Sequence, residues 1–452
     1  MKFDIAIIGG GPGGYTAAEA AAREGLSVVL FEREQLGGTC LNRGCIPTKA
    51  LLHATEAYSS VQHCGELGID VNNYSYNFEA MHERKNQVVL TLRQSIEKLM
   101  KSCRVTVVSG SARITGETSI VCKGESFEAE NIIIATGSRP AMIPVPGIDL
   151  DGVYTSDDLL EGAGIKLKSL VIIGGGVIGV ECASIYLMLD ASVTIIESME
   201  HILPSMDREL SQRLTMSLKK QGAVIEAGAT VTSISGAPGN MAVSYRTKKG
   251  EERIANAEGV LVAAGCRAQT AGLFADNVEL ELQRDAIVSD KMGRTSIPNI
   301  YVIGDARYGN IQLAHVAAAQ ARNVVALIAG KDLPVDESIV PSCIFTNPEI
   351  ASVGLTESQA KEMGYAVKTL KTLTGANGKC VIENAQGGFV KLVTDSETGV
   401  ILGAQLICPR ATDLIGELSV AVQTKMTAKQ LSAVIHAHPT FYEIIGDCAA
   451  LW

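Results

Sequence analysis

Two cysteines five residues apart stand in the segment of the chain that is richest in possible chemistry. Cys40 and Cys45 lie in Gly-Gly-Thr-Cys-Leu-Asn-Arg-Gly-Cys-Ile-Pro-Thr-Lys, which spans residues 37–49. Residues five apart on a regular α-helix are about 7.5 Å apart along the axis, too far for a relaxed disulfide. Gly44 and Pro47 could supply the local irregularity that brings the two sulfurs together. The spacing alone leaves two interpretations open, a redox disulfide or two unrelated buried cysteines.

A glycine fingerprint precedes this segment at the start of the chain. Gly9, Gly11 and Gly14 match G-x-G-x-x-G, whose glycines allow a tight turn, close approach of backbone to a pyrophosphate, and packing of helix on strand. A strand, a helix and a second strand are expected at residues 3–8, 15–23 and 27–31. Glu32 ends the second strand, where its carboxylate can accept hydrogen bonds from ribose hydroxyls. Together these features predict a dinucleotide-binding βαβ unit rather than a plain glycine turn.

The same unit occurs a second time. Gly174, Gly176 and Gly179 repeat the fingerprint, and the strand, helix and strand are expected at residues 170–173, about 180–189 and 192–196. Glu197 ends the last strand, where a carboxylate holds a free 2′-hydroxyl and repels the 2′-phosphate of NADP. NAD is therefore favoured over NADP, unless Glu197 is simply a solvated strand end. Two units predict two dinucleotides, or one dinucleotide and one degenerate copy.

The composition of the chain excludes several classes of protein. Its 452 residues predict several domains with separate cores. A formal net charge of −10 argues against a broad basic surface for nucleic acid or anionic lipid. Glycines interrupt the first apolar run where a signal peptide needs a continuous apolar centre, so we expect neither an export signal nor a membrane span. The 11 cysteines, an odd number in a long chain, indicate a reducing compartment and a cytoplasmic location.

The order of strands and turns predicts an α/β fold with two Rossmann-like dinucleotide-binding domains and a C-terminal α/β domain. Further apolar strands are expected at residues 131–135, 259–264, 300–303, 389–393 and 399–407. A proline-rich turn at residues 143–147 marks the first boundary. The predicted segments are a first nucleotide-binding domain at 1–146, a second at 147–266, a return to the first domain at 267–334, and the C-terminal domain at 335–452.

Residues 37–49, directly after a flavin-type βαβ unit, strongly resemble the pyridine nucleotide–disulfide oxidoreductases. The resemblance runs essentially from end to end. Its other motifs are the second fingerprint, Ala-Thr-Gly-Ser-Arg-Pro at 135–140, Ile-Tyr-Val-Ile-Gly-Asp-Ala at 300–306, Gln-Leu-Ala-His at 312–315 and His-Ala-His-Pro-Thr-Phe-Tyr-Glu at 436–443. Within the family the chain most resembles the dihydrolipoamide dehydrogenases. This implies FAD and NAD as cofactors, no metal, and oxidation of dihydrolipoyl groups to lipoyl groups.

The resemblance implies a role for each residue of the redox centre. Cys40 and Cys45 form a redox disulfide, in which Cys40 exchanges with the dithiol substrate and Cys45 lies nearest the flavin. Lys49 sits beside flavin N5 and pairs with Glu181, although either could be an ordinary surface charge. Electrons pass from the dithiol through Cys45 and FAD to NAD, and the chemistry of the last step belongs to the cofactors.

His438 and Glu443 match the catalytic base of the family and the carboxylate that orients it. An imidazole is suited to taking a proton from a thiol near neutral pH, and a carboxylate behind it fixes the tautomer and stabilises the imidazolium. His436 and His315 are interpreted as structural histidines, although His315 belongs to a motif that lines the flavin.

The resemblance also implies which residues contact the cofactors, with Asp305 on the flavin ribityl chain. The implied contacts are Gly9, Gly11, Gly14, Glu32, Gly38, Thr39, Lys49, Ala112, Thr136, Gly137, Ser138, Asp305, Ala314, Gly174, Gly176, Gly179, Glu197, Val231 and Gly265. The C-terminal domain is expected to form the interface of a homodimer.

The expected partner is a protein that carries a lipoyl group, because the sequence contains no lipoyl domain. It is either a lipoylated acyltransferase of a 2-oxo acid or acetoin complex or the lipoyl carrier of glycine cleavage. No nucleic acid and no membrane are expected as partners.

Three alternatives compete with this interpretation: an NADPH-dependent reductase such as a glutathione reductase, a mercuric reductase, and a redox-silent flavoprotein. Glu197 argues against NADPH, and the pair Cys40 and Cys45 argues against a redox-silent protein. The C-terminal vicinal cysteine pair of the mercuric reductases is missing. Two departures from the family pattern stand out. Residues 266–270 replace a more basic, proline-containing run, and the tail after Glu443 is short.

Overall fold

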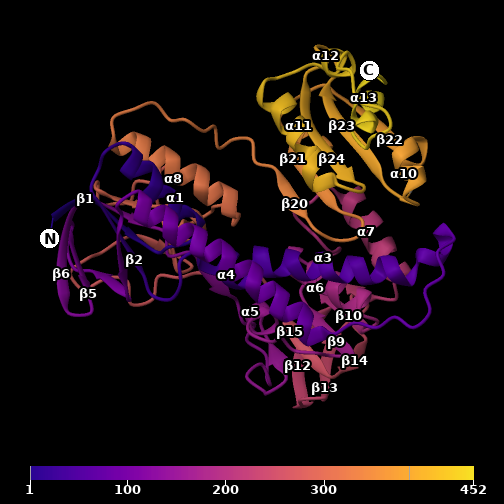
Figure 1. Ribbon diagram of the computed structural model, residues 1–452, viewed down its shortest axis with the longest axis horizontal. Helices are drawn as coiled ribbons and strands as arrows, with labels where there is room; N and C mark the ends of the chain where they lie inside the picture. Colours follow the sequence, from indigo (N-terminus) through magenta and orange to yellow (C-terminus); the bar gives the residue numbers. More distant parts are fainter. Residues whose placement is uncertain (1, 386) are drawn as a thin grey trace.

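The chain folds into three lobes, each built around its own β-sheet. The computed structural model describes residues 2–385 and 387–452. Figure 1 shows the first lobe at the left, the second below the centre and the C-terminal lobe at the upper right. The long helices α3 (Cys45–Gln62) and α4 (Phe78–Ser102) pack against each other, and Figure 1 shows α4 running from the first lobe to the second and α3 lying along the second lobe. A short 3₁₀ helix, η1 (Cys64–Leu67), follows α3.

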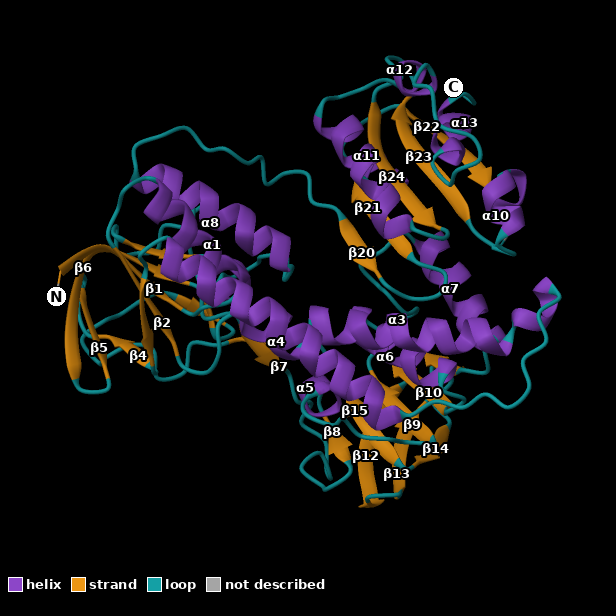
Figure 2. Cartoon of the chain, viewed as in Figure 1, coloured by secondary structure: helices purple, strands orange, loops and turns teal. Residues whose placement is uncertain are grey.

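The first lobe holds a seven-stranded sheet in the order β3-β2-β1-β6-β5-β4, with β19 beside β6. Its strands are β1 (Lys2–Ile8), β2 (Val28–Glu32), β3 (Thr106–Ser109), β4 (Ala112–Ile114), β5 (Ser119–Cys122), β6 (Glu125–Ile134) and β19 (Ile300–Val302). Strands β3, β2, β1, β6 and β19 run parallel. The fully buried Ile5, Ala6 and Ile7 make β1 a central strand covered on both faces. Helices α1 (Pro12–Arg23) and α8 (Ala314–Ile328) pack against each other beside this sheet (Figure 2).

The second lobe pairs a parallel sheet, β11-β10-β9-β15-β8, with a small antiparallel sheet, β12-β13-β14. Its strands are β8 (Val153–Tyr154), β9 (Ser169–Ile173), β10 (Ser192–Glu197), β11 (Val224–Ala227), β12 (Thr230–Ala237), β13 (Asn240–Arg246), β14 (Glu252–Ala257) and β15 (Gly259–Val262). Its helices are α5 (Ser156–Leu160), α6 (Val177–Met188) and α7 (Arg208–Lys220). The two sheets share one core, whereas α6 is apolar and buried almost throughout because it lies on the other face of the parallel sheet, between β9, β10 and α3.

Two antiparallel segments connect the first two lobes side by side. The chain leaves the first lobe through β7 (Ser138–Pro140) and returns through β16 (Cys266–Ala268), which pairs with β7. The returning segment then forms the hairpin β17 (Leu282–Gln283) and β18 (Ala286–Ile287), strand β19 and the 3₁₀ helix η2 (Gly304–Ala306).

The C-terminal lobe is an antiparallel sheet, β20-β21-β24-β23-β22. Its strands are β20 (Ser342–Ile344), β21 (Ile350–Gly354), β22 (Val367–Leu373), β23 (Phe389–Asp395) and β24 (Ile401–Ile407). Its helices are α9 (Glu357–Glu362), η3 (Thr374–Ala376), α10 (Gly378–Ile382), α11 (Ala411–Gln423), α12 (Ala428–Ser432) and α13 (Glu443–Ala449). Helix α11 packs on β21 and β24, and α13 packs on β22 and β23.

Both fingerprint helices begin three residues earlier than the sequence predicts. Helix α1 starts at Pro12 rather than at residue 15, and α6 starts at Val177 rather than at about residue 180. The third glycine of each fingerprint, Gly14 or Gly179, therefore lies in the first turn of the helix. Proline fits the first helical position because no N–H is needed there, so glycine and proline do not mark a loop here.

Helix α4 carries a buried histidine where it meets the segment after α5. His82 is 2% exposed, its ring lies 4.5 Å from that of Phe78, and its Nδ1 has no hydrogen-bond partner among the described residues. Lys85, one turn on, donates to the carbonyls of Leu160 and Gly162. Burial, reinforced by the Lys85 ammonium, lowers the pKa of His82 to about 4. His82 is therefore neutral in the folded chain near neutral pH.

The buried His82 predicts a loss of stability in mild acid. Below the ordinary pKa of 6.5 an unfolded chain binds a proton at His82 that the folded chain does not bind until about pH 4. Stability is therefore lost as the pH falls through this window, by about 2 kcal/mol at pH 5. Urea unfolding of His82→Leu at pH 7 and pH 5 should show a correspondingly smaller acid loss. The variant His53→Leu, at an exposed position, should lose as much stability between pH 7 and pH 5 as the wild type does. An equal loss in all three proteins would show that His82 is not the source of the acid sensitivity.

No helix within the described residues is long and apolar enough to cross a membrane.

Candidate active site

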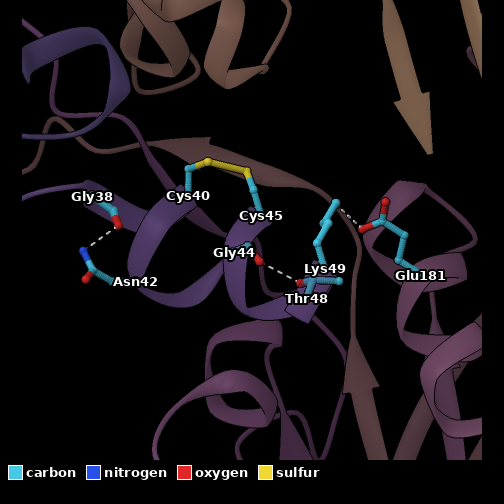
Figure 3. Close-up of a disulfide and its surroundings, with 8 residues drawn as sticks. All are labelled: Gly38, Cys40, Asn42, Gly44, Cys45, Thr48, Lys49 and Glu181. Carbon is cyan, nitrogen blue, oxygen red and sulfur yellow. Dashed lines mark hydrogen bonds and ion pairs between the residues drawn. A yellow bond between two sulfur atoms is a disulfide. The ribbon is translucent and has the colours of Figure 1, made fainter. Parts of the chain in front are cut away.

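A break between two helices brings Cys40 and Cys45 together as a disulfide (Figure 3). Helix α2 (Gly38–Arg43) ends before Gly44, whose φ of −134° and ψ of −108° are not helical, and α3 begins at Cys45. The two Cα atoms are 4.7 Å apart, within the usual range for a disulfide. A Cβ at Gly44 would lie 3.0 Å from the Thr39 carbonyl oxygen, so glycine suits this close approach. The disulfide is confirmed, and the irregularity lies at Gly44 alone, because Pro47 continues the first turn of α3.

Asn42 holds the short helix α2 in place. Its Nδ2 donates to the carbonyl oxygens of Gly38 at 2.9 Å and Leu36 at 3.1 Å. Its Oδ1 accepts hydrogen bonds from Arg93 Nη2 at 2.8 Å and Nε at 3.0 Å, and Arg93 belongs to α4. A helix of six residues has little stability of its own, so these contacts fix the cysteine that it carries.

Lys49 and Glu181 form an ion pair in which all three lobes take part. Lys49 lies one turn after Cys45 on α3, and its Nζ is 2.8 Å from Glu181 Oε2 (Figure 3). Glu181 lies on α6 and is 3% exposed. Its other oxygen accepts the N–H of Phe345, just after β20, at 3.0 Å. The Phe345 ring also lies 4.5 Å from Lys49 Nζ, so the ammonium is held by a carboxylate and an aromatic face.

The two glycine fingerprints have the same geometry. A Cβ at the first glycine, Gly9 or Gly174, would collide with a main-chain carbonyl of the neighbouring strand end, and one at the third would collide with the first glycine. The middle glycine faces space instead, because nothing lies within 4 Å of a Cβ at Gly176 and only Gly38 Cα, at 3.8 Å, is near one at Gly11. The middle glycines also begin α1 and α6 without a side-chain cap. Each helix start is thus open to an anion.

The acids at the strand ends support the two glycine turns. Glu32 accepts the N–H groups of Gly10 at 2.7 Å and Glu34 at 2.8 Å. Glu197 accepts those of Gly175 at 2.6 Å and Met199 at 2.7 Å. Burial raises the pKa of Glu32, opposed by the Gly10 N–H. Both carboxylates therefore stand at the edge of their sheets, with their position fixed by backbone donors.

Polar side chains gather where β6 and β19 end. Ser138 Oγ donates to Asp305 Oδ2 at 2.6 Å, and Asp305 lies in η2 directly after β19. Burial raises the pKa of Asp305, which the Ser138 hydroxyl counteracts. Thr136 Oγ1, after β6, is buried without a hydrogen-bond partner in the described chain. These strands run parallel to β1, so Thr136 and Asp305 share the carboxyl edge of the sheet with the first fingerprint.

The remaining predicted contacts fall in two groups. Gly38, Thr39, Gly137 and Ala314 lie at helix starts or strand ends around the first fingerprint, and Gly265 follows β15 beside the second. Ala112 on β4 and Val231 on β12 are each 8% exposed, and their side chains belong to the hydrophobic cores. Only their main chains are left to face a ligand.

His438 and Glu443 form a hydrogen-bonded pair in the C-terminal lobe. His438 Nδ1 is 2.8 Å from Glu443 Oε1, and the second carboxylate oxygen accepts the N–H of Thr440 at 2.8 Å. The Thr440 N–H, followed by His438, lowers the pKa of Glu443. The His438 side chain is 79% exposed. The pair is thus formed within one chain, and it stands in a different lobe from the disulfide.

Sequence reasoning missed three contributors to this arrangement. Phe345 stands in an ordinary apolar run, Arg93 on a helix that the periodicity did not predict, and Glu417, which pairs with His436 at 2.9 Å, on the surface of α11. Each acts through a partner distant in sequence, so no local pattern marks it. No group of three or more His, Cys, Asp or Glu side chains in the described residues is arranged to hold a metal ion.

Comparison with known proteins decides the family. Residues 3–321 match the family model of pyridine nucleotide-disulphide oxidoreductases, and residues 340–449 match the dimerisation domain of the same family. The chain belongs to this family. The resemblance and the α/β fold class expected from the sequence are confirmed, and the C-terminal lobe is the dimerisation domain of this family member.

Full-length relatives narrow the comparison. Dihydrolipoyl dehydrogenase of Chlorobaculum parvum is 39% identical over 456 residues, which cover 99% of this chain and 96% of the relative. Dihydrolipoyl dehydrogenase of Bacillus subtilis is 38% identical over 465 residues, or 99% and 97% of the two chains. Among solved structures, a Cu(II) complex of the HOCl-induced flavoprotein disulfide reductase RclA from Escherichia coli matches with a TM-score of 0.89 and 30% identity, covering 100% and 99%.

Proposed function

We propose that this protein oxidises protein-bound dihydrolipoyl groups to lipoyl groups and reduces NAD to NADH, with FAD as its bound flavin. The observation that carries this proposal is the Cys40–Cys45 disulfide one helical turn from the Lys49–Glu181 pair. It occurs in a chain that is similar over nearly its whole length to proteins named dihydrolipoyl dehydrogenase. The proposed catalytic residues are Cys40, Cys45, Lys49, Glu181, His438 and Glu443.

The carboxyl edge of the first sheet fits FAD. The open start of α1 suits a pyrophosphate, and a cavity of about 500 Å³ lined by Glu32, Leu36 and Arg93, among others, suits the adenosine end. Thr136 offers an unused hydroxyl, and the Ser138–Asp305 pair offers polar groups for the ribityl chain. When bound, FAD supplies the two-electron transfer between the disulfide and NAD.

The second lobe fits NAD by the same logic. The open start of α6 and the Glu197 carboxylate repeat the arrangement of the first lobe, and Gly265 lies at the neighbouring strand end. Glu197 is already held by two backbone N–H groups, so its negative charge stays in place. A 2′-phosphate at this point would meet that charge.

The residues of the chain can carry the dithiol half of the reaction. His438 takes the proton from one dihydrolipoyl thiol, and Glu443 holds the imidazolium that results. The substrate thiolate attacks Cys40 Sγ, which breaks the Cys40–Cys45 bond, forms a mixed disulfide and leaves Cys45 as a thiolate. The second substrate thiol then attacks the substrate sulfur of the mixed disulfide, and its proton passes to Cys40 Sγ, which leaves as a thiol. The substrate has then lost two electrons, and the cysteine pair has gained them.

We infer that each active site is shared between the subunits of a homodimer. The dimerisation domain carries His438 with most of its ring exposed, while the cysteines lie in the first lobe. Exposed apolar side chains in the same domain support a large covered surface, and they include Val420, Val434, Ile435 and Tyr442. A two-fold pair would place the base of each subunit at the disulfide of the other.

The wider setting follows from the proposed reaction. A lipoylated acyltransferase or lipoyl carrier protein would deliver the dithiol. The nine cysteines outside the disulfide are free thiols, which supports a reducing, cytoplasmic location. The pairing of β7 with β16 supports domain boundaries near residues 146 and 266, since both crossings between the lobes lie there. The third boundary, at residue 334, lies between α8 and β20.

A related flavin-dependent disulfide reductase is the second candidate. The structural likeness to the reductase RclA favours it, because that protein is named for disulfide reduction. The two candidates share the disulfide and differ in substrate and direction.

Steady-state assays of the purified protein separate the two candidates. Dihydrolipoamide with NAD should be turned over, whereas NADPH with oxidised glutathione should be at least about a hundredfold slower, since a site built for one substrate loses several kcal/mol with another. Cys40→Ser and Cys45→Ser should each abolish dithiol oxidation, because neither can form the disulfide. Full dithiol activity in both variants would rule out the redox centre.

Cofactor preference depends on the charge of Glu197. Electrostatic exclusion of the 2′-phosphate should give NAD an advantage over NADP of at least tenfold in kcat/KM, or about 1.4 kcal/mol. Glu197→Gln removes the charge and keeps an acceptor for one of the two backbone N–H groups, so the preference for NAD over NADP should narrow. Glu32→Gln is the matched control in the first lobe and should leave the ratio unchanged. An unaltered ratio in Glu197→Gln would show that Glu197 does not read the ribose.

Subunit mixing tests the shared site. Inactive Cys45→Ser subunits are mixed with inactive His438→Ala subunits under conditions that allow exchange. Each mixed dimer would contain one intact site, and a random mixture would recover up to about a quarter of wild-type activity, because half of the dimers are mixed. No recovery despite demonstrated exchange, or full activity in a purified monomer, would place His438 in the same subunit as its cysteines.

A further inference from the structure

A second histidine–carboxylate pair stands directly behind the proposed base. His436 Nε2 is 2.9 Å from Glu417 Oε1. The side chains are 10% and 24% exposed, whereas that of His438, two residues on, is 79% exposed. His436 is thus buried on the same stretch of chain that presents His438 to solvent.

His436 lies between the two helices that bound the proposed catalytic pair. Glu417 is on α11, which packs against β21 and β24. On the other side of the ring stands Gly446 of α13, where a Cβ would lie 2.8 Å from His436 Nδ1. Because α13 begins at Glu443, the His436 ring fixes the distance between the helix that carries Glu443 and α11.

Hydrogen bonds also fix the segment that carries His436 and His438 at its C-terminal end, around Thr440. Thr440 donates through Oγ1 to the Ala437 carbonyl at 2.7 Å, and Asn377 Nδ2 donates to the Thr440 carbonyl at 3.0 Å. At the N-terminal end of the same segment, the Glu417–His436 contact links it to α11 through side chains. The His438 ring therefore projects from a loop held on both sides.

We propose that Glu417 and His436 are positioning residues, which hold His438 and Glu443 where proton transfer from the substrate thiol requires them. The inference rests on the proposed function. His436 cannot itself take this proton, because Glu417 occupies one ring nitrogen and the α13 backbone covers the side of the other. A general base must lie within hydrogen-bond reach of the proton that it removes, so a shift of about 1 Å in the loop would slow the step up to about a hundredfold.

The test compares two half-reactions in the full-length holoenzyme. Reduction of the disulfide by dihydrolipoamide requires His438, whereas oxidation of NADH with ferricyanide as acceptor bypasses it. Glu417→Ala should slow the first by about tenfold or more while the second stays within about twofold. Glu417→Gln keeps an acceptor for His436 and should recover most of the lost rate. The control is Glu357→Ala, an exposed glutamate of the same domain paired with Lys361, which should match the wild type in both reactions.

Several outcomes would overturn the inference. A dithiol rate in Glu417→Ala equal to that of the wild type would show that the pair does not position the base. A parallel fall in both half-reactions, or failure of Glu417→Gln to recover, would make the pair a general structural element.

Failure of the proposed function would look different, because the wild type and His438→Ala would then be equally poor with dihydrolipoamide. In that case crystal structures of the wild type and of Glu417→Ala would decide whether Glu417 positions the His438–Glu443 pair. Loss of the 2.8 Å His438–Glu443 contact in the variant supports positioning, and its retention overturns it.

Discussion

The ion pair between Lys49 and Glu181 is the interaction on which the arrangement of this molecule depends. Lys49 comes from the first lobe, Glu181 from the second, and Phe345 of the C-terminal lobe contacts both. Glu181 is almost fully buried, and a buried charge left without its partner costs about 3–5 kcal/mol. The pair therefore disfavours any rotation of the lobes that would separate these groups. The disulfide benefits directly, because Cys45 lies one helical turn before Lys49.

The break at Gly44 is the local counterpart of this long-range constraint. A continuous helix would hold Cys40 and Cys45 apart, whereas the change of direction at Gly44 brings their Cα atoms to 4.7 Å. Helix α2 is too short to be rigid alone, and Asn42 and Arg93 anchor it to α4. The redox centre thus combines a non-helical joint at Gly44 with attachments on both sides of the disulfide.

How far the sequence predicted this structure follows from the range of each interaction. The two βαβ units were predictable because the strand, the glycines, the helix and the terminal acid all lie within about thirty residues. The early starts of α1 and α6 were not, since glycine and proline usually signal loops. Helix α4, the sheet β12-β13-β14 and the contacts of Phe345 escaped prediction because each is decided by packing against distant segments. Pairing His438 with Glu443 rested on the family resemblance, because no local pattern marks the two as partners.

Each half of the proposed chemistry is organised within a single chain before the halves meet. The disulfide is closed and anchored in the first lobe, and the His438–Glu443 pair is formed on a loop fixed by Asn377 and Glu417. When two subunits associate, the disulfide and the His438–Glu443 pair then only have to be aligned. Neither has to become ordered at that step. Because little conformational entropy would be lost at that step, more of the apolar contact around Ile435 is left to offset the translational and rotational entropy that association costs. In the proposed reaction, the accuracy of proton transfer would thus be set by the fold of the C-terminal lobe, and dimerisation would bring the base to the sulfur.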